Sequence, residues 1–247
     1  MEIPSPADRF SRTTRLLGDD ILPRFSAAKV ILFGVGGVGS WCAEALVRTG
    51  ISHLTIVDFD RVSASNINRQ LMATCSTVGE MKVDVLARRL LDINPDLDLT
   101  VISQPFTADT AADFHLESYT HCIDAIDSLA HKAALILEAT STKGLKFYSS
   151  MGAALKLDPT RISVAEFWNV RGCPLARALR QRFKRLSVRP ARKFKCVYSD
   201  ELLPNLGSTD ETCDYKAAIN GSLAHITAIF GMTLAGLLIT DLSKNRS

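Results

Sequence analysis

A glycine-rich turn after an apolar segment limits what this chain can fold into. The apolar residues 29–33 predict a buried strand, and residues 40–48 after the turn predict a helix. In such a strand–turn–helix unit, glycine lets the backbone approach a phosphate, and the helix N-terminus supplies free N–H groups. The candidate phosphate-binding glycines are Gly34, Gly36, Gly37 and Gly39. The turn therefore predicts an α/β protein that binds a nucleotide.

Strand and helix patterns alternate along the chain after the turn. Residues 80–93 place Val83, Leu86 and Leu90 on one face of a predicted helix, and Pro95 ends it. Strands are predicted at 54–58, 99–102, 121–123, 146–149, 161–167 and 194–198. Further helices are predicted from the end of the strand at 121–123 through residue 143, at 174–185 and at 221–240. This alternation predicts a Rossmann-like, doubly wound and mostly parallel sheet, with additional C-terminal strands and a terminal apolar helix.

Charged side chains follow the glycine turn at informative distances. Asp58 ends the second predicted strand, where a carboxylate accepts ribose hydroxyls. Cations near a glycine turn suit a triphosphate better than the diphosphate bridge of a nicotinamide dinucleotide, because each charge-assisted contact contributes about 1.5–3 kcal/mol. The further candidate nucleotide ligands are Asp60, Asn66, Arg69, Gln70 and Lys82. We therefore predict ATP as the nucleotide.

Carboxylates also end the strand at 121–123. Asp124 and Asp127 follow it, and ligands of open α/β sheets bind at the carboxyl ends of strands. One or both carboxylates can hold Mg²⁺ beside a triphosphate. The structural alternative is that Asp127 caps the helix that follows. We select Asp127 as the metal ligand and Ser128 as its neighbour in the nucleotide site.

Basic residues concentrate in one segment of the second half. Residues 171–195 contain ten Lys or Arg and no acid, which leaves 19 basic and 26 acidic residues elsewhere. This asymmetry favours a polyanionic partner such as nucleic acid, although a basic run can also be a solvated face. The candidate phosphate contacts are Arg177, Arg180, Lys184, Arg185, Arg189, Arg192 and Lys193. Phe183 and Phe194 are candidates for base stacking, with core packing as the favoured alternative.

The cysteines and the N-terminal residues bear on the cellular compartment of the protein. The six cysteines include no C-x-x-C pair, so neither a zinc tetrad nor a thioredoxin-type site is expected. We expect packing roles for Cys42, Cys75 and Cys122, and a catalytic role for Cys173, Cys196 or Cys213 is disfavoured. The first 15 residues have no apolar core, so a reduced, cytoplasmic protein is expected.

Residues 221–240 are apolar and long enough to span a membrane. Their small residues, Gly231, Ala235 and Gly236, suit close packing, so we expect a core or dimer-interface helix without stable membrane insertion. We interpret the chain as one domain, 1–247, with an N-terminal arm at 1–28, an ATP-binding half at 29–150 and a substrate and dimer half at 151–247. The arm is predicted to be helical with a break at Pro23, and residues 200–216 to be a mobile loop.

As a set, these motifs resemble the ubiquitin-activating-like (ThiF-type) adenylyltransferase superfamily. The resemblance is carried by residues 9–12, the glycine turn, 58–60, 66–70, Lys82 and Asp127. It implies that Asp58 binds ribose, that Asn66, Arg69 and Lys82 hold phosphates, and that Asp127 holds Mg²⁺. It also implies a homodimer in which Arg12, or failing that Arg15, reaches the partner's ATP.

Within that superfamily, the chain is similar to the tRNA threonylcarbamoyladenosine dehydratase branch. The likeness is carried by residues 39–50, by Asp124 to Ser128, where many relatives have Asp-Asn at the metal position, and by residues 174–184. It implies that ATP adenylates the threonylcarbamoyl carboxylate on a tRNA adenosine, after which ring closure releases AMP. A cysteine desulfurase system is a further partner to consider on this resemblance. Activation of a ubiquitin-like sulfur carrier and dinucleotide-dependent oxidoreduction stay open as alternatives.

Overall fold

The computed structural model describes residues 4–207 and 220–244. The strands are β1 (Lys29–Phe33), β2 (His53–Val57), β3 (Asp98–Ile102), β4 (His121–Asp124), β5 (Lys146–Ser150), β6 (Ile162–Glu166) and β7 (Lys195–Ser199). The α-helices are α1 (Pro6–Arg9), α2 (Ser11–Leu17), α3 (Ile21–Ala27), α4 (Gly39–Thr49), α5 (Lys82–Ile93), α6 (Leu129–Ser141), α7 (Pro174–Arg185) and α8 (Ala224–Lys244). The short 3₁₀ turns include η1 (Ala64–Asn66) and η5 (Phe167–Asn169).

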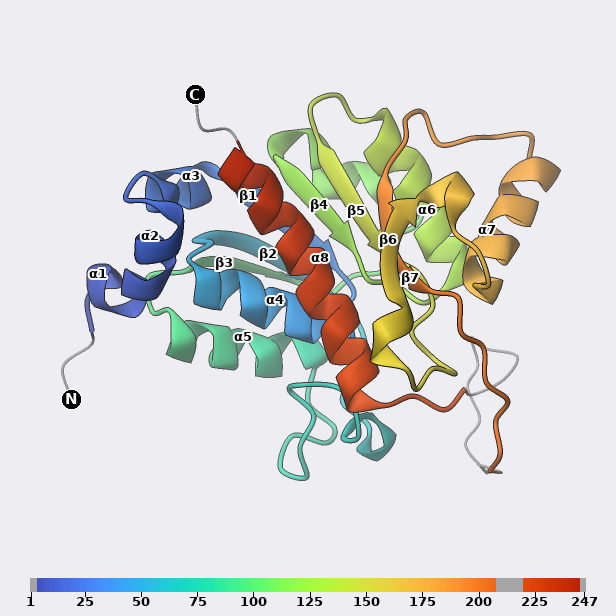
Figure 1. Ribbon diagram of the computed structural model, residues 1–247, viewed down its shortest axis with the longest axis horizontal. Helices are drawn as coiled ribbons and strands as arrows, with labels where there is room; N and C mark the ends of the chain where they lie inside the picture. The colour runs from blue at the N-terminus through green and yellow to red at the C-terminus, as the bar shows by residue number, and fades with distance from the viewer. Residues whose placement is uncertain (1–3, 208–219, 245–247) are drawn as a thin grey trace.

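Within the described residues, seven strands form one sheet in the order β3-β2-β1-β4-β5-β7-β6 (Figure 1). All neighbouring strands run parallel except β6, which pairs antiparallel with β7 at the edge. The order reverses between β1 and β4, and such a switch point opens a crevice at the carboxyl ends of the strands. The predicted doubly wound, mostly parallel fold with added C-terminal strands is confirmed.

Two hydrophobic cores lie on opposite faces of the sheet. Along β1, Val30 and Leu32 pack into the core under α3, α4, α5 and α8, while Ile31 and Phe33 pack into the core under α6 and α7. Successive side chains of a strand point to opposite faces, so a strand buried on both sides is apolar throughout. Residues 30–33 are therefore all apolar, because helices cover both faces of the strand.

Helix α8 crosses the sheet beside α4 (Figure 1). A Cβ on Gly231 would lie 2.4 Å from the carbonyl oxygen of Val38 and 2.9 Å from the amide nitrogen of Cys42, so the two helix backbones touch there. Ile226, Phe230 and Leu234 of α8 are buried. By length and composition alone α8 could span a membrane, and 39% of its apolar stretch is buried in this fold. The inner face of α8 therefore packs into the core, as predicted, while residues on its outer face such as Met232 are exposed.

Exchanging the two glycines of α8 should give opposite results. Gly231→Ala is expected to lower the free energy of unfolding by about 1–3 kcal/mol, because its Cβ would meet backbone atoms that cannot rotate away. Gly236→Ala is the matched control, since a Cβ there meets nothing within 4 Å and alanine favours a helix by up to about 1 kcal/mol. Urea denaturation of both variants measures the difference, and equal stabilities would contradict the close helix contact.

The N-terminal arm differs from its prediction in one detail. Pro23 is the third residue of α3, where a helix has no internal partner for an N–H group, so it does not break the arm. The break falls instead at Gly18, whose φ of 95° ends α2. The arm leads directly into β1 and packs against Gly50 and His53, close to the start of β2. It therefore lies at the amino ends of the strands, away from the glycine turn.

Candidate nucleotide site and basic surface

The glycine turn joins β1 to α4 beside the loop that follows β4. Gly34 has a φ of 83°, and a Cβ there would lie 2.8 Å from the Ala125 carbonyl oxygen. A Cβ on Gly39 would lie 1.8 Å from the Gly34 carbonyl oxygen. The turn cannot close with a side chain at either position. At Gly36 the nearest atom to a Cβ is Gln70 Nε2, at 3.8 Å, so the protein itself leaves that backbone accessible.

Asp58 ties the turn to the end of β2. Its Oδ2 accepts a hydrogen bond from the Val35 amide at 2.8 Å, and its Oδ1 accepts one from the Asp60 amide at 2.9 Å. Burial raises the pKa of this carboxyl group, and the Lys82 charge and the two amide donors act in the opposite direction. Each carboxylate oxygen can accept a second hydrogen bond. Asp58 can therefore shape the turn and still accept a ribose hydroxyl.

Lys82 is the first residue of α5 and contacts Asp60, two residues after Asp58. Its ammonium lies 2.7 Å from Asp60 Oδ2, and its amide donates to the Asp60 carbonyl oxygen at 3.0 Å. Lys82 is buried with 6% of its surface exposed, whereas the Asp60 side chain keeps 53% exposed. A lysine held this way is a fixed positive charge at the carboxyl end of the sheet. The predicted nucleotide ligands Asp58, Asp60 and Lys82 are thus brought together.

The 3₁₀ turn η1 and the residues that follow it place three more predicted residues near the glycine turn. The Asn66 side chain accepts from the Ser63 amide at 3.2 Å, which closes the 3₁₀ turn. The Arg69 guanidinium donates to the Ser65 carbonyl oxygen and to Asn68 Oδ1, both at 2.8 Å. Gln70 is buried beside Gly36, and its Oε1 has no hydrogen-bond partner among the described residues. A buried acceptor without a donor costs free energy, so Gln70 is suited to a ligand with an N–H or O–H group.

The loop after β4 separates the two predicted metal ligands. Asp124 is fully buried and pairs with Lys132 at 2.7 Å, and it also accepts from Ser149 Oγ at 2.6 Å and from the Ile126 amide at 3.0 Å. It is a structural carboxylate, so the suggestion that both acids hold Mg²⁺ does not suit Asp124. Asp127 is exposed at the crevice, and Ser128, not Asp127, is the N-cap residue of α6.

Lys132 was not predicted from the sequence, although a lone lysine inside an apolar helix was a usable signal. Its ammonium is fully buried, and it donates to the Ile126 carbonyl oxygen at 2.9 Å as well as pairing with Asp124. These contacts hold both ends of the 124–126 loop. Lys132 therefore positions the backbone that carries Asp127.

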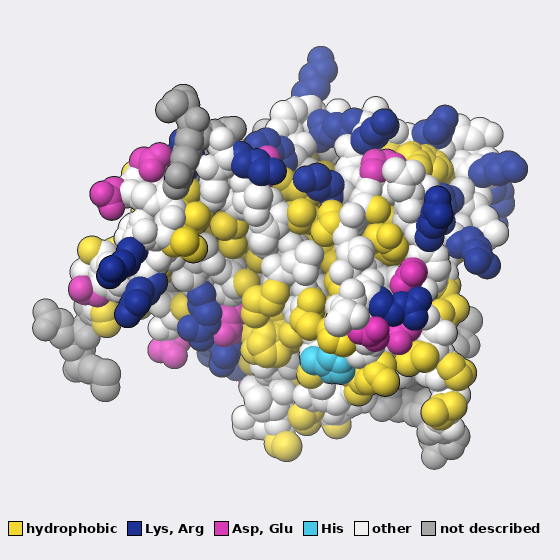
Figure 2. Space-filling model, viewed as in Figure 1, with side chains coloured by type: hydrophobic (Ala, Val, Ile, Leu, Met, Phe, Trp, Pro, Cys, Tyr) yellow, Lys and Arg dark blue, Asp and Glu magenta, His cyan; other side chains and the backbone are white. Residues whose placement is uncertain are grey.

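Basic side chains line α7 and the segment after it. Figure 2 shows Lys and Arg gathered at the upper right, on the side where α7 lies in Figure 1. Most of the predicted phosphate contacts are exposed there, namely Arg177, Lys184, Arg185, Arg189 and Lys193. Arg180 is partly buried and donates to the Phe167 carbonyl oxygen at 3.1 Å.

Arg192 does not join this surface. Its guanidinium donates to the carbonyl oxygens of Ala139, at 2.7 Å, and Leu145, which bracket the end of α6. The two aromatic residues of this segment that were candidates for base stacking also have a clear outcome. Phe183 and Phe194 are 1% and 5% exposed, so core packing is confirmed over base stacking.

The cysteines divide by exposure. Cys42 and Cys122 are buried as predicted, and burial raises the pKa of both thiols. Cys75 is exposed, so its predicted packing role is wrong; it lies in a turn where the Thr74 amide donates to Thr77 Oγ1 at 2.9 Å. Cys173 and Cys196 are buried, and Cys213 lies outside the described residues.

The fold and this site define an α/β nucleotide-binding protein whose cations stand beside its glycine turn. The chain belongs to the ThiF family, whose sequence model matches residues 10–247. It is 40% identical over 218 residues to a tRNA threonylcarbamoyladenosine dehydratase of Escherichia coli, covering 86% of this chain and 81% of that one. A Bacillus subtilis protein of the same name is 33% identical, covering 96% and 95%.

Solved structures agree with the sequence relatives. The crystal structure of E. coli tRNA N6-threonylcarbamoyladenosine dehydratase, TcdA, in complex with AMP superposes with a TM-score of 0.86 at 35% identity, covering 98% of this chain and 97% of that one. The ATP complex of the same enzyme gives a TM-score of 0.85 at 34% identity with the same coverage. This chain is therefore similar over nearly its whole length to an enzyme that binds ATP and AMP.

Proposed function

We propose that this protein is an ATP-dependent tRNA threonylcarbamoyladenosine dehydratase. The observation that carries the proposal is the convergence of the glycine turn, Asp58, Lys82 and the Asp127 loop at the switch point of the sheet. It is supported by the dehydratases that match this chain almost end to end. We place the protein in the cytoplasm, where its proposed substrates occur.

We assign the nucleotide contacts to the residues around the turn. The amides of residues 34–39 and the start of α4 face the phosphates, with Gly36 and Gly37 giving close access to the backbone. Asp58 accepts a ribose hydroxyl, and the carboxamide of Gln70 fills its missing hydrogen bond with the nucleotide. Asn66, Arg69 and Lys82 hold the phosphates, and each charge-assisted contact contributes about 1.5–3 kcal/mol.

The chemistry follows from what a carboxylate lacks. Its oxygen is a poor leaving group, so an oxygen of the threonylcarbamoyl carboxylate attacks the α-phosphorus of ATP and pyrophosphate departs. The neighbouring carbamoyl group then attacks the activated acyl carbon, the acyl–oxygen bond to AMP breaks, and a ring closes with net loss of one water. The reacting groups belong to the substrate, so the protein positions them and neutralises charge at the α-phosphate. This agrees with the burial of Cys173 and Cys196.

Mg²⁺ is proposed at Asp127. Among the described residues no three His, Cys, Asp or Glu side chains gather in one place, and Asp127 is an exposed acid in the loop that follows the carboxyl end of β4. Mg²⁺ usually takes one or two protein carboxylates and completes its shell with phosphates and water. One carboxylate beside a triphosphate fits that pattern. Bound there, the ion would neutralise phosphate charge.

A homodimer is proposed from two features. Met232 on α8 is 45% exposed and Leu223, just before the helix, is 42% exposed, and Figure 2 shows hydrophobic side chains across the middle of this side of the molecule. Arg12 is exposed on the arm at the opposite end of the strands from the glycine turn, so it can reach an ATP only in another subunit. A monomer in analytical ultracentrifugation at assay concentrations would contradict this assembly.

The function is tested on tRNA that carries the threonylcarbamoyl group. With ATP and Mg²⁺, mass spectrometry of the digested tRNA should show the loss of one water from the modified nucleoside and one AMP per turnover. A reaction without Mg²⁺ and one with unmodified tRNA are the controls. An unchanged nucleoside would overturn the proposal, and pyrophosphate exchange with a carrier peptide ending in Gly-Gly would favour activation of a sulfur carrier instead.

The exposed cations of α7 should govern tRNA binding but not ATP binding. The triple variant Arg177→Ala, Lys184→Ala, Arg185→Ala is expected to weaken tRNA binding about tenfold or more and to flatten its dependence on salt, because phosphate contacts release counterions. ATP affinity should stay within about twofold, because the nucleotide site is built from other elements. Filter binding across a salt series measures this, and a salt-independent affinity of the unaltered protein would remove the assignment.

A further inference from the structure

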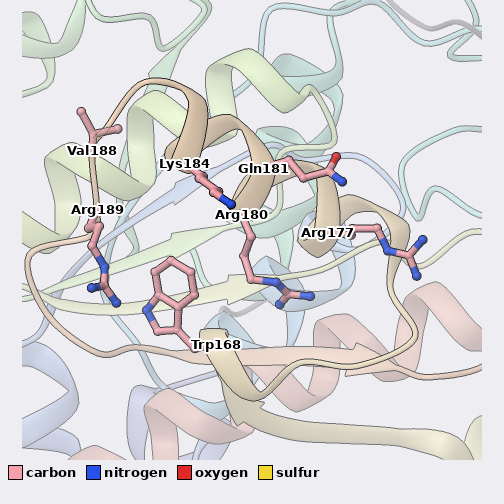
Figure 3. Close-up of a pocket in the computed structure, with 7 residues that line it drawn as sticks. All are labelled: Trp168, Arg177, Arg180, Gln181, Lys184, Val188 and Arg189. Atoms are coloured by element: carbon pink, nitrogen blue, oxygen red, sulfur yellow. The ribbon is translucent and has the colours of Figure 1, made fainter.

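A cavity beside α7 has features that the nucleotide site does not use. It has a volume of about 440 Å³ and opens between α7, η5 and the segment after α7 (Figure 3). Its walls are formed by Trp168, Arg177, Arg180, Gln181, Lys184, Val188 and Arg189. Four of these seven side chains are cations and none is an acid. A concave site of that composition suits an anion with a flat apolar part.

Trp168 gives the cavity its aromatic wall. The residue keeps 38% of its surface exposed, while its neighbour Phe167 is fully buried. The two rings meet edge to face, with 5.1 Å between their centres. The Trp168 amide donates to Glu166 Oε2 at 2.9 Å, which fixes the turn that carries the ring. A large ring held at the mouth of a cavity is not explained by core packing. It is a preformed flat surface.

The cations are arranged around this ring. The Arg189 guanidinium carbon lies 5.0 Å from the centre of the indole, and Figure 3 shows both side chains at one end of the cavity. Arg180 braces the wall through the Phe167 carbonyl oxygen. One face of α7 carries three more residues of the cavity wall, spaced four and three residues apart: Arg177, Gln181 and Lys184. Both cations among them are exposed. A cation thus already lies over the indole ring on which a nucleobase would stack.

We propose that this cavity binds an unpaired nucleotide of RNA. The base stacks on Trp168, Gln181 offers hydrogen bonds to its edge, and Arg177, Lys184 and Arg189 contact the flanking phosphates. Aromatic platforms bind single strands because every base has a π-face, whereas bases inside a duplex are already stacked. The inference rests on the proposed function for the identity of the RNA as tRNA.

The cavity lies apart from the nucleotide site. Glu166, the last residue of β6 before η5, lies opposite Lys195 in the strand register, at the amino end of β7. The glycine turn instead follows the carboxyl end of β1. The cavity therefore does not hold the reacting adenosine. It binds a different unpaired nucleotide and so favours RNA in which a loop, not a stem, lies along α7.

Short RNA without ATP tests the site directly. Tryptophan fluorescence is titrated with single-stranded oligoadenylate and with a fully paired RNA duplex of the same strand length. The single strand should quench the unaltered protein and bind more tightly than the duplex. Trp168→Leu is expected to weaken single-strand binding about tenfold, measured with labelled oligonucleotide, because stacking on an aromatic ring is lost. Trp168→Phe, which keeps an aromatic face, should stay within about threefold of the unaltered protein.

The remaining outcomes separate this inference from the proposed function. Equal binding by Trp168→Leu and the unaltered protein, or a preference for the duplex, would overturn the inference even if tRNA is dehydrated normally. Stacking at Trp168 by a protein that leaves modified tRNA unchanged would support the cavity and overturn only the dehydratase assignment. ATP affinity measured in both Trp168 variants, expected to be unchanged, excludes general unfolding as the cause.

Discussion

Lys82→Met is expected to lower the rate of AMP formation by about 100-fold or more. Lys82 is the buried cation beside the glycine turn, and removing one preorganised charge from a site of phosphoryl chemistry costs this much in other enzymes. The fold should survive, because Asp60 keeps 53% of its side chain exposed and water replaces the lost ammonium. Measuring AMP release and urea denaturation on the same sample tests both halves of this expectation.

The control for Lys82 lies on the same helix. Arg88 pairs with Glu80 at 2.6 Å on the surface of α5, and exposed ion pairs contribute about 0–1 kcal/mol. Arg88→Met should therefore leave AMP formation and stability nearly unchanged. Near-normal AMP release by Lys82→Met would remove the lysine from the mechanism, and an equal loss in both variants would point to the helix instead of the charge.

Lys132→Met should lower the free energy of unfolding by about 3–5 kcal/mol. The substitution leaves the Asp124 carboxylate fully buried without its counter-charge, and breaking such a pair on one side costs about this much. The Ser149 hydroxyl and the Ile126 amide still donate to Asp124, but neither carries a charge. Urea denaturation measures the loss, and a change below about 1 kcal/mol would contradict the buried pair.

A second substitution separates charge from shape. In the double variant Asp124→Asn, Lys132→Met, neither charge of this buried pair remains, and the asparagine oxygen can still accept from the Ile126 amide. It should recover more than half of the lost stability, because removing both members of a buried pair costs much less than removing one. Additive losses would show that Lys132 stabilises the fold by packing alone. AMP formation in the double variant then reports how far Lys132 positions the Asp127 loop.

The elements of the fold were largely predictable, and for a local reason. Apolar strands bounded by turn residues, and helices with apolar faces, are patterns of neighbouring residues, so α7 was predicted with the observed bounds and β1 likewise. The arm was less predictable, because proline is compatible with the first turn of a helix and the true break depends on Gly18.

The nucleotide site was predictable where its residues sit at element ends. Asp58, Lys82 and the glycine turn lie next to the carboxyl ends of strands or at the start of a helix, and a parallel sheet brings those ends together. What could not be predicted was which of the two acids is buried. Asp124 and Asp127 look alike in sequence, but Asp124 is fully buried against Lys132 and Ser149, whereas Asp127 is exposed.

From residue order alone, the chain determined its α/β fold, the position of the phosphate-binding turn and the concentration of positive charge between residues 171 and 195. Only the tertiary structure decided that Arg192 turns inward to the carbonyl oxygens of Ala139 and Leu145, and that Trp168 stands exposed among the cations of α7. The reason is physical: backbone patterns depend on neighbours in the chain, whereas the burial and partners of a side chain depend on residues that folding brings from far away.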